Sequence, residues 1–177
     1  MTINRFLNSI KLKRYKKRGL IVGKNFNMES RVHIDPGFPW LVKIGNNVTL
    51  APEVMILAHD ASEKKAIGNT SVAKVTIGDN VFIGAKSIIL QGVTIGDNVI
   101  IGAGSIVTRN IPSNSIACGC PAKTIKEIDT FAKEKTKLYN NSTTISISDI
   151  KAAKKDVKLR EHLQKRIGNE RAYIYEE

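Results

Sequence analysis

The sequence predicts a mainly β protein whose short strands are wound into a coil of hexapeptide repeats. From Ile77 to Val107 an aliphatic residue stands at every sixth position, and a small or β-branched residue follows four places later. A period of six fits neither an amphipathic helix nor plain strand alternation. A strand and a turn form one side of a coil, and three sides close it, so the repeated side chains stack inward. The aliphatic positions are Ile77, Ile83, Ile89, Ile95, Ile101 and Val107, and their partners are Val81, Ser87, Val93, Val99, Ser105 and Ile111.

The same register continues toward the N-terminus as apolar residues spaced by six over positions 20–56. Counted in coils of about 18 residues, the segment at Val32 is expected to stack against the segment at Leu50. This count places His33 and His59 on different faces of one prism. The apolar positions are Leu20, Phe26, Val32, Phe38, Ile44, Leu50 and Ile56.

The register breaks once, between Ile56 and Ile77. This spacing is 21 residues, which is not a multiple of six, and the intervening residues are polar and charged. We expect a loop at about 59–74 that leaves the regular stack, and loops on rigid scaffolds often carry function. The turns between strands read Gly-Asp-Asn or Gly-Asn-Asn, and residues such as Gly45 and Asn47 tolerate positive φ there.

Residues 1–19 are expected to form a basic N-terminal helix that ends at Gly19. The segment carries seven basic residues and no acidic one, and Phe6, Leu7 and Ile10 suit one apolar helical face. One interpretation is a peripheral membrane anchor, because each Lys or Arg near an anionic leaflet contributes about 1 kcal/mol. The other is a helix that caps the end of the domain and turns its charges to water.

Residues 129–177 are expected to form a C-terminal helical extension, because the six-residue register stops after Ile128. A helix is predicted from Ser148 or Asp149, with Gly168 as its stop. Its charge pattern suits a solvated face, and docking on a neighbouring subunit is the alternative.

Composition limits the classes of function and the compartment. The formal charge of +12 indicates an acidic partner without identifying it. No apolar run is long enough to span a membrane and no secretory signal is evident, so we expect a cytoplasmic protein, with residues 1–19 as the candidate contact to the inner face of the membrane. Cys118 and Cys120 are interpreted as reduced thiols, and we predict no metal site. The repeats lack a basic stripe interleaved with aromatic residues, so we expect no nucleic-acid partner.

The repeats resemble those of a known family. The repeated IGDNVxIGAxS, with IGAGSIVTRNIP and CGCPAKTIKEI after it, resembles the hexapeptide-repeat acyltransferases of the left-handed parallel β-helix fold over roughly residues 20–128. Residues 40–61, with HDAS at positions 59–62 closing the stretch, most resemble the sugar O-acetyltransferases that act on maltose, galactosides and colanic acid. The resemblance implies an acetyl-CoA-dependent enzyme that acetylates a sugar hydroxyl, assembly of identical chains into a homotrimer, and a role in surface polysaccharide or glycan biosynthesis.

Acetyl transfer to a hydroxyl requires a base, a donor to the oxygen that gains charge, and a surface that holds both substrates. Histidine is the natural base near neutral pH, and the chain has His33, His59 and His162. The resemblance places the base at His59, directly after the expected strand 54–57. His162 lies in the charged C-terminal segment and is interpreted as a surface residue.

Three more residues are candidates near the base. Asp60 and Asp35 are candidates to orient the imidazole and hold its tautomer, as carboxylates do for catalytic histidines. His33 lies within a residue or two of a position where several relatives have an acceptor-binding asparagine, so the resemblance implies an acceptor-side role. A buried structural histidine is the alternative for His33.

The resemblance places the pantetheine arm of acetyl-CoA in a groove between two β-helices. Ala85 and Ala103 would let the arm lie against backbone, and Phe82 stands where relatives often have a tryptophan. The alternative for both alanines is that tight coils require small residues. Thr108 is a further donor-side candidate. The basic candidates for the phosphates of coenzyme A are Arg109, Lys123 and Lys126.

Three other functions deserve comparison. An N-acetyltransferase of a nucleotide-linked amino sugar would keep the fold and the donor. A zinc-dependent carbonic anhydrase of the same fold needs three histidine ligands, and this chain has one of its three histidines outside the repeats. A β-helix without catalytic activity, serving in structure or binding, is the remaining alternative.

Overall fold

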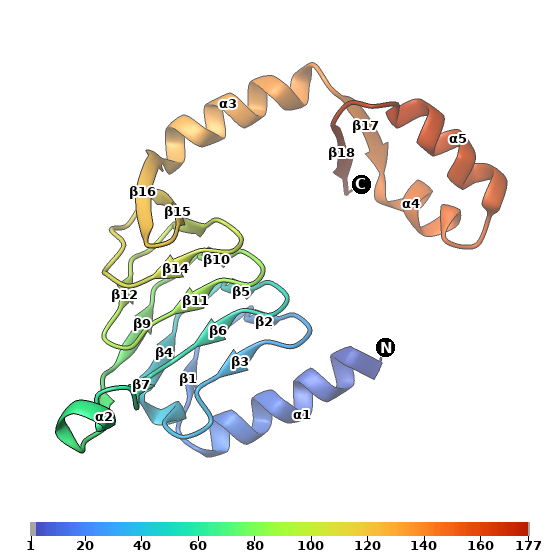
Figure 1. The fold of residues 1–177 in the computed structure, drawn as a ribbon. Helices are drawn as coiled ribbons and strands as arrows, with labels where there is room; N and C mark the ends of the chain where they lie inside the picture. Colours follow the sequence, from blue (N-terminus) through green and yellow to red (C-terminus); the bar gives the residue numbers. More distant parts are fainter. Residues whose placement is uncertain (1–2, 177) are drawn as a thin grey trace. The chain divides into compact units, whose positions relative to one another are not determined.

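The structure is a computed structural model that describes residues 3–176 and the side chains from Leu7 to Glu176. The chain divides into two compact units, Met1–Ile128 and Asp129–Glu177. The first unit is a three-sided coil of short parallel strands that begins with a helix (Figure 1). The predicted mainly β class, with helices at both ends of the chain, is therefore confirmed.

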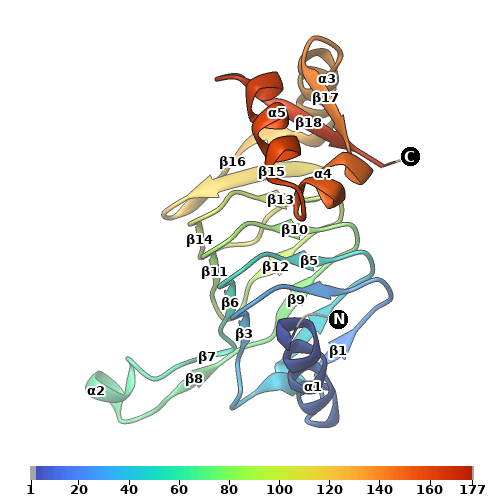
Figure 2. The same ribbon diagram turned by 90° about the vertical axis from the view of Figure 1, so that its right-hand side faces the viewer.

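The strands of the coil form three sheets, one on each side (Figure 2). Neighbouring strands are parallel throughout, except that β16 folds back antiparallel on β15. The elements of sheet 1 are β1 (Ile21–Val22), β4 (Val42–Ile44), β9 (Val75–Ile77) and β12 (Thr94–Ile95). Those of sheet 2 are β2 (Asn27–Met28), β5 (Thr49–Leu50), β10 (Phe82–Ile83), β13 (Ile100–Ile101), β15 (Ser115–Gly119) and β16 (Ala122–Glu127). Those of sheet 3 are β3 (His33–Ile34), β6 (Met55–Ile56), β11 (Ile88–Ile89) and β14 (Ile106–Val107).

The repeated aliphatic residues fill the interior of the coil. Ile77, Ile83 and Ile89 are fully or almost fully buried, and so are valines at the accompanying positions such as Val81 and Val93. Burying one such side chain contributes roughly 1.5–3 kcal/mol relative to leaving it exposed. Because every coil adds the same inward residues, the stack of coils is the hydrophobic core of this unit.

The first coil is longer than predicted, and the predicted stacking of Val32 against Leu50 is wrong. Ile34 lies opposite Ile56, and partners in the first two coils are 22 residues apart. A 3₁₀ turn, η1 (Pro39–Leu41), is part of an enlarged corner between β3 and β4. The corner adds residues to the first coil and so changes the register of the chain. Apolar residues still stand six apart through the corner, so the spacing alone does not reveal this change. As a result β3 and β6 are neighbours in sheet 3, and His33 lies on the same face as the strand that leads to His59.

The asparagines and glycines of the turns have different roles, although the sequence suggested that both tolerate positive φ. Asn47, Asn80 and Asn98 have positive φ, as predicted, but the repeat glycines such as Gly45 do not. A Cβ on Gly45 would lie 2.6 Å from the carbonyl oxygen of Gly78 in the next coil. The repeat glycines are therefore needed for the close approach of coils. The asparagines also form a ladder, in which Asn47 Nδ2 donates to Asn80 Oδ1 at 2.9 Å.

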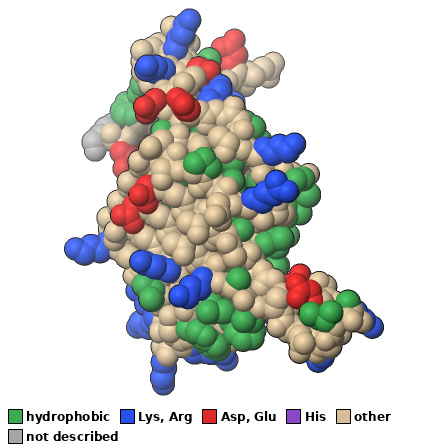
Figure 3. Space-filling model, turned by 90° about the vertical axis from the view of Figure 1, so that its left-hand side faces the viewer, with side chains coloured by type: hydrophobic (Ala, Val, Ile, Leu, Met, Phe, Trp, Pro, Cys, Tyr) green, Lys and Arg blue, Asp and Glu red, His purple; other side chains and the backbone are tan. Residues whose placement is uncertain are grey.

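The inserted segment is a hairpin that projects from the coil (Figures 1 and 3). Its strands, β7 (His59–Asp60) and β8 (Ser71–Val72), pair antiparallel, and α2 (Lys64–Ile67) lies at its tip. The expected loop at about 59–74 therefore has regular structure at its base. This pairing fixes the backbone of His59 where the chain leaves sheet 3.

The N-terminal helix α1 (Ile3–Lys17) closes the first coil. The Tyr15 side chain is buried, Asn8 Nδ2 donates to the Met28 carbonyl at 2.8 Å, and Lys11 Nζ donates to the Val32 carbonyl at 2.7 Å. These contacts favour the interpretation of α1 as an end cap. Leu7 and Ile10 are about half exposed, so the expected apolar face is not packed. The first two residues of the segment, and the Phe6 side chain, lie outside the described residues.

Within residues 3–176, no helix has the length and apolar content needed to cross a bilayer. The second unit differs from the expected helical extension because it also contains a two-stranded parallel sheet. The single helix predicted from Ser148 to Gly168 is wrong, since Ser146 and Asp156 each accept a capping hydrogen bond and start separate helices. Ile145, Ala153 and Leu163 form its small core. Its elements are α3 (Ile128–Asn140), β17 (Thr143–Ser146), α4 (Ile147–Ala153), α5 (Val157–Ile167) and β18 (Ala172–Tyr175).

Candidate active site

The candidate site centres on a hydrogen-bonded pair, Asp35 and His59. Asp35 follows β3 and His59 follows β6, and these strands are neighbours in sheet 3, so both residues leave the sheet at the same corner. His59 Nδ1 is hydrogen-bonded to Asp35 Oδ2. The Asp35 side chain is fully buried, whereas about a third of the His59 side chain is exposed. An ionised carboxylate only accepts hydrogen bonds, so Nδ1 carries a proton, and in the neutral imidazole Nε2 is the atom with the free lone pair.

The Asp35 carboxylate is held by backbone amides as well as by His59. Oδ1 accepts from the amides of Gly37 at 2.9 Å and Phe38 at 3.2 Å, and Oδ2 accepts from the amide of Ala58 at 2.9 Å. Burial alone would raise the pKa of this carboxyl, but the hydrogen bonds from His59 and the three amides outweigh it and hold the pKa below its ordinary value. Asp35 is therefore a fixed negative charge behind the imidazole.

An aromatic wall lies against the imidazole. The ring of Phe38 is 5.3 Å from the ring of His59 between centroids, and Trp40 packs edge-on against Phe38 at 5.4 Å. From the sequence, Phe38 is expected only as one of the apolar residues spaced by six, and not as a site residue. The signal available was the Asp-Pro-Gly sequence beginning at Asp35, which is typical of a turn that brings a following residue back toward the strand end.

Asp60 does not share the role of Asp35. Its Oδ1 accepts from the amide of Ser62 at 2.8 Å, within the hairpin turn. This hydrogen bond is the main reason that the pKa of Asp60 lies below its ordinary value. The structure therefore places the two sequence candidates differently, with Asp35 on the imidazole and Asp60 on the local backbone.

His33 lies on β3, two residues before Asp35, and is half-buried. Burial and the nearby positive charge of Lys11 lower the pKa of His33, while the Asp35 charge opposes them. His33 lines a pocket of about 250 Å³ between β3 and α1. His162 is exposed on α5 in the second unit, as the sequence predicts.

The donor-side candidates lie on two different parts of the coil. Phe82 is 46% exposed on β10 of sheet 2, next to Ile100 on β13. Ala85 and Ala103 follow these strands one coil apart, and the Gly104 amide donates to the Ala85 carbonyl at 2.8 Å. Lys123 and Lys126 lie on β16 of the same sheet.

Thr108 and Arg109 instead follow β14 in sheet 3, at the end of the sheet where His59 leaves β6. Two strand spacings separate β14 from β6, which corresponds to about 10 Å. Within one chain, Thr108 and Arg109 therefore lie at the same end of sheet 3 as His59. Phe82, Ala85 and Ala103 lie on or directly after strands of sheet 2. Within the described part of the chain, no three His, Cys, Asp or Glu side chains form a group that could hold a metal ion.

Comparisons with known proteins agree on one family. A model described as the hexapeptide repeat of succinyl-transferase matches residues 74–109. Protein CapG of Staphylococcus aureus is 47% identical over 108 residues, which cover 59% of this chain and 61% of CapG. The structure of a maltose O-acetyltransferase from Clostridium difficile 630 is 42% identical with a TM-score of 0.52, covering 62% of this chain and 59% of that one.

A galactoside acetyltransferase solved in complex with coenzyme A is 35% identical, with a TM-score of 0.53. That match covers 67% of this chain and 70% of the other. The chain spans about three fifths of the length of CapG and of the maltose O-acetyltransferase. The first unit, which contains the coil and the Asp35 and His59 pair, accounts for most of this chain's length.

Proposed function

Because this chain belongs to the hexapeptide-repeat acetyltransferase family, we propose that it transfers an acetyl group from acetyl-CoA to a hydroxyl group of a sugar or glycan. The observation that carries the proposal is the hydrogen bond between His59 Nδ1 and the buried Asp35 carboxylate. It leaves Nε2 as a partly exposed base at the end of a rigid strand. The similarity to galactoside and maltose acetyltransferases supports a sugar acceptor.

In the proposed reaction, His59 Nε2 accepts the proton of the acceptor hydroxyl as its oxygen attacks the thioester carbonyl carbon. The new C–O ester bond forms, the C–S bond breaks, and the thiolate of coenzyme A leaves and takes up the proton from the imidazolium. Asp35 stabilises the imidazolium and keeps its orientation. Acetyl passes directly between the two bound substrates, without a covalent enzyme intermediate.

The residues around Ala85 and Ala103 fit a long, thin donor. Ala103 is exposed, and a Cβ on the adjacent Gly104 would meet no atom within 4 Å, so this turn is open on its outer side. By contrast, a Cβ on Gly84 would lie 2.5 Å from the Ala103 amide nitrogen, so Gly84 serves the packing of coils. Arg109 and Lys123 are exposed cations that suit the phosphates of coenzyme A.

The distribution of these residues supports a homotrimer. His59 and Arg109 lie at the end of sheet 3, whereas Phe82 and Ala103 belong to sheet 2. A groove between the sheet 3 corner of one copy and sheet 2 of the next would bring base and donor together. We place this enzyme in surface polysaccharide or glycan assembly in the cytoplasm.

Substitution of the base tests the proposal. His59→Ala is expected to lower kcat by about 100-fold or more while acetyl-CoA binding, measured by calorimetry, stays close to wild type. His162→Ala, at the exposed histidine of α5, is the matched control and should keep full turnover. Near-normal turnover of His59→Ala, measured as acetyl-CoA-dependent thiol release, would contradict the assignment. Paired hydroxyl and amino sugars in the same assay separate O-acetylation from N-acetylation.

A further inference from the structure

A basic pocket lies between α1 and β3 and has no role in the mechanism above. Its volume is about 250 Å³. Three cationic side chains line it and, among the residues that the structure describes, no Asp or Glu does. The lining residues are Lys11, Arg14, Tyr15, Arg18, His33 and Pro36.

The helix and the turn after it present these cations on one side. Lys11 and Arg14 lie on α1, and Arg18 directly follows its last residue, with its amide donating to the Arg14 carbonyl at 3.2 Å. The three residues are three and then four positions apart, so they share one face and span about 10 Å along the helix axis. Tyr15, on the same face, is buried, and its hydroxyl oxygen accepts from the Ile34 amide at 3.3 Å. Lys11 Nζ also donates to the Val32 carbonyl. These contacts fix this face of α1 against β3.

The charge of the pocket is not balanced by the protein. Among residues 3–176, none of the three cations is within ion-pair distance of a carboxylate, whereas Arg31 on the next turn of the coil is paired with Glu53. Asp35, the nearest acidic residue in sequence to the pocket wall, is fully buried and already accepts from His59 and three amides. A concave site lined by one sign of charge concentrates ligands of the opposite sign.

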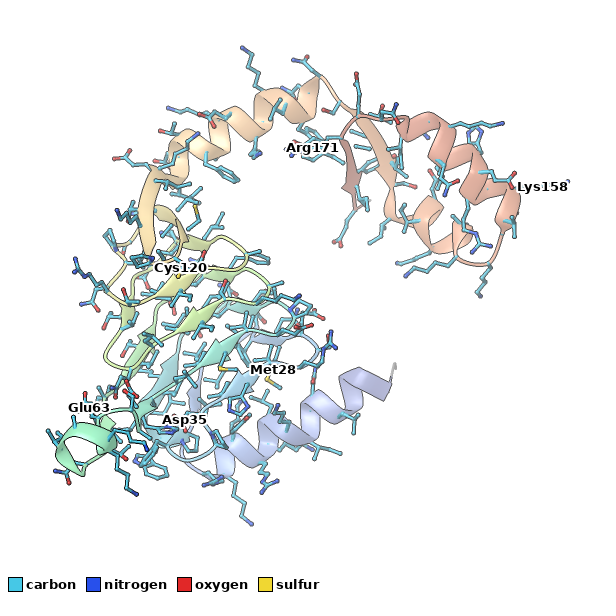
Figure 4. All side chains as sticks on the ribbon, in the orientation of Figure 1. Met28, Asp35, Glu63, Cys120, Lys158 and Arg171 are labelled. Atoms are coloured by element: carbon cyan, nitrogen blue, oxygen red, sulfur yellow. The ribbon has the colours of Figure 1, made fainter. Side chains whose placement is uncertain are left out.

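The pocket adjoins the candidate active site. His33 and Pro36, which line it, flank Asp35 on the same strand and turn, and Asp35 lies beside the C-terminal half of α1 (Figure 4). His33 is two strand residues, about 7 Å, from Asp35, and Pro36 is adjacent to Asp35, so the pocket wall is close to the carboxylate that accepts from His59. A group bound in the pocket would therefore belong to the acceptor or to something attached to it.

We propose that this pocket binds the diphosphate group of a diphosphate-linked acceptor sugar, and thereby selects such acceptors over free neutral sugars. The inference rests on the proposed function and adds the class of its acceptor. Three cations match the charge of a diphosphate better than the single charge of a carboxylate, and two guanidinium groups offer bidentate hydrogen bonds to phosphate oxygens. His33 supplies a further hydrogen-bonding group at the end nearest the base.

Direct binding of inorganic pyrophosphate tests the pocket without relying on catalysis. Calorimetry of the full chain at about 0.15 M salt, with saturating coenzyme A, is expected to detect pyrophosphate binding. The double variant Arg14→Gln/Arg18→Gln should weaken it by about tenfold or more. The matched control is Lys13→Gln/Lys17→Gln, which removes two charges from exposed positions of α1 outside the pocket and should bind like wild type. Arg18→Gln alone replaces the double variant if that variant does not fold.

Three results would overturn the proposal. The first is no pyrophosphate binding to wild type. The second is an equal loss of affinity in both double variants, which would indicate a general effect of net charge. The third is a matching loss of acetyl-CoA affinity in Arg14→Gln/Arg18→Gln, which would assign the pocket to the donor. Failure of wild type to bind acetyl-CoA would contradict the proposed function instead, so the two failures are distinguishable.

Competition then distinguishes the sources of the diphosphate. A nucleoside diphosphate displaces pyrophosphate if the acceptor is nucleotide-linked, and a short isoprenyl diphosphate in detergent micelles displaces it if the acceptor is lipid-linked. In thiol-release assays with the better of the two acceptor types, KM should rise about tenfold in Arg14→Gln/Arg18→Gln and stay unchanged in Lys13→Gln/Lys17→Gln. An unchanged KM in both variants would exclude the pocket from acceptor recognition.

Discussion

At the scale of single residues, the candidate site depends on the buried Asp35 carboxylate. Three backbone amides and the His59 imidazole all donate to it. Each oxygen accepts two hydrogen bonds, so neither can rotate away without leaving donors unpaired. The carboxylate therefore joins the turn after β3 to the start of the hairpin, and it sets the orientation of the His59 imidazole.

Replacement of Asp35 by asparagine separates this role from that of Asp60. The introduced side-chain amide would turn its NH₂ group toward other donors, so Asp35→Asn should lower kcat by about 100-fold and destabilise the fold by about 1–3 kcal/mol. Asp60→Asn, which alters the hairpin turn only, should keep kcat near wild type. Thiol-release kinetics and urea unfolding measure both effects. Equal kcat values for the two variants would contradict the assignment of Asp35 as the positioning residue.

The pH dependence of stability follows from the lowered pKa of Asp35. Because the folded state holds this pKa below its ordinary value of 3.8, the unfolded state takes up the proton first as the pH falls. The stabilisation is therefore complete above this ordinary value and is lost as the pH falls through the folded-state pKa. Urea unfolding at a series of pH values should show the difference between wild type and Asp35→Asn shrinking below pH 3.8. A difference that stays constant to the lowest pH with a folded protein would exclude this linkage.

At the scale of elements, the regular coils were predictable and the irregular ones were not. From β9 to β14 every coil repeats the same inward residues, so a period of six identifies both strands and turns. In the first coil, the enlarged corner around η1 shifts the register while apolar residues remain six apart, so the sequence concealed that β3 pairs with β6. The Asp35 and His59 pair could be named as candidates, but their contact depended on this pairing. In the second unit, α3 and the β17–β18 pair have too few buried positions to give a period.

The repeat glycines allow a test of coil packing. Gly45→Ala places a Cβ 2.6 Å from the Gly78 carbonyl oxygen, so the coils must separate, and we expect a loss of about 3 kcal/mol or more in the free energy of unfolding. Gly104 has positive φ, but a Cβ there meets no atom within 4 Å. Gly104→Ala should therefore cost about 1 kcal/mol from backbone strain alone. Chemical unfolding measures both, and an equal or smaller loss in Gly45→Ala would contradict the packing role.

At the scale of the whole molecule, the left-handed β-helix of this family sets which residues one chain can bring together. Its three sheets are flat sides of a prism, and side chains on different sides point away from each other. His59 and Asp35 belong to one corner of sheet 3, whereas Ala103 follows a strand of sheet 2. If the site lies between copies, base and donor groove come from different chains.

Mixed assembly of two inactive variants tests this directly. His59→Ala removes the proposed base, and Ala103→Trp would fill the proposed donor groove, so each variant should be inactive alone. When the two are unfolded together and refolded, about a quarter of the sites in random trimers combine an intact His59 from one chain with an intact Ala103 from the next, so about a quarter of wild-type turnover should return. His59→Ala mixed with Asp35→Asn is the control, because both changes affect the same corner and no site regains both residues. Equal, negligible turnover in the two mixtures would mean that base and donor groove belong to one chain.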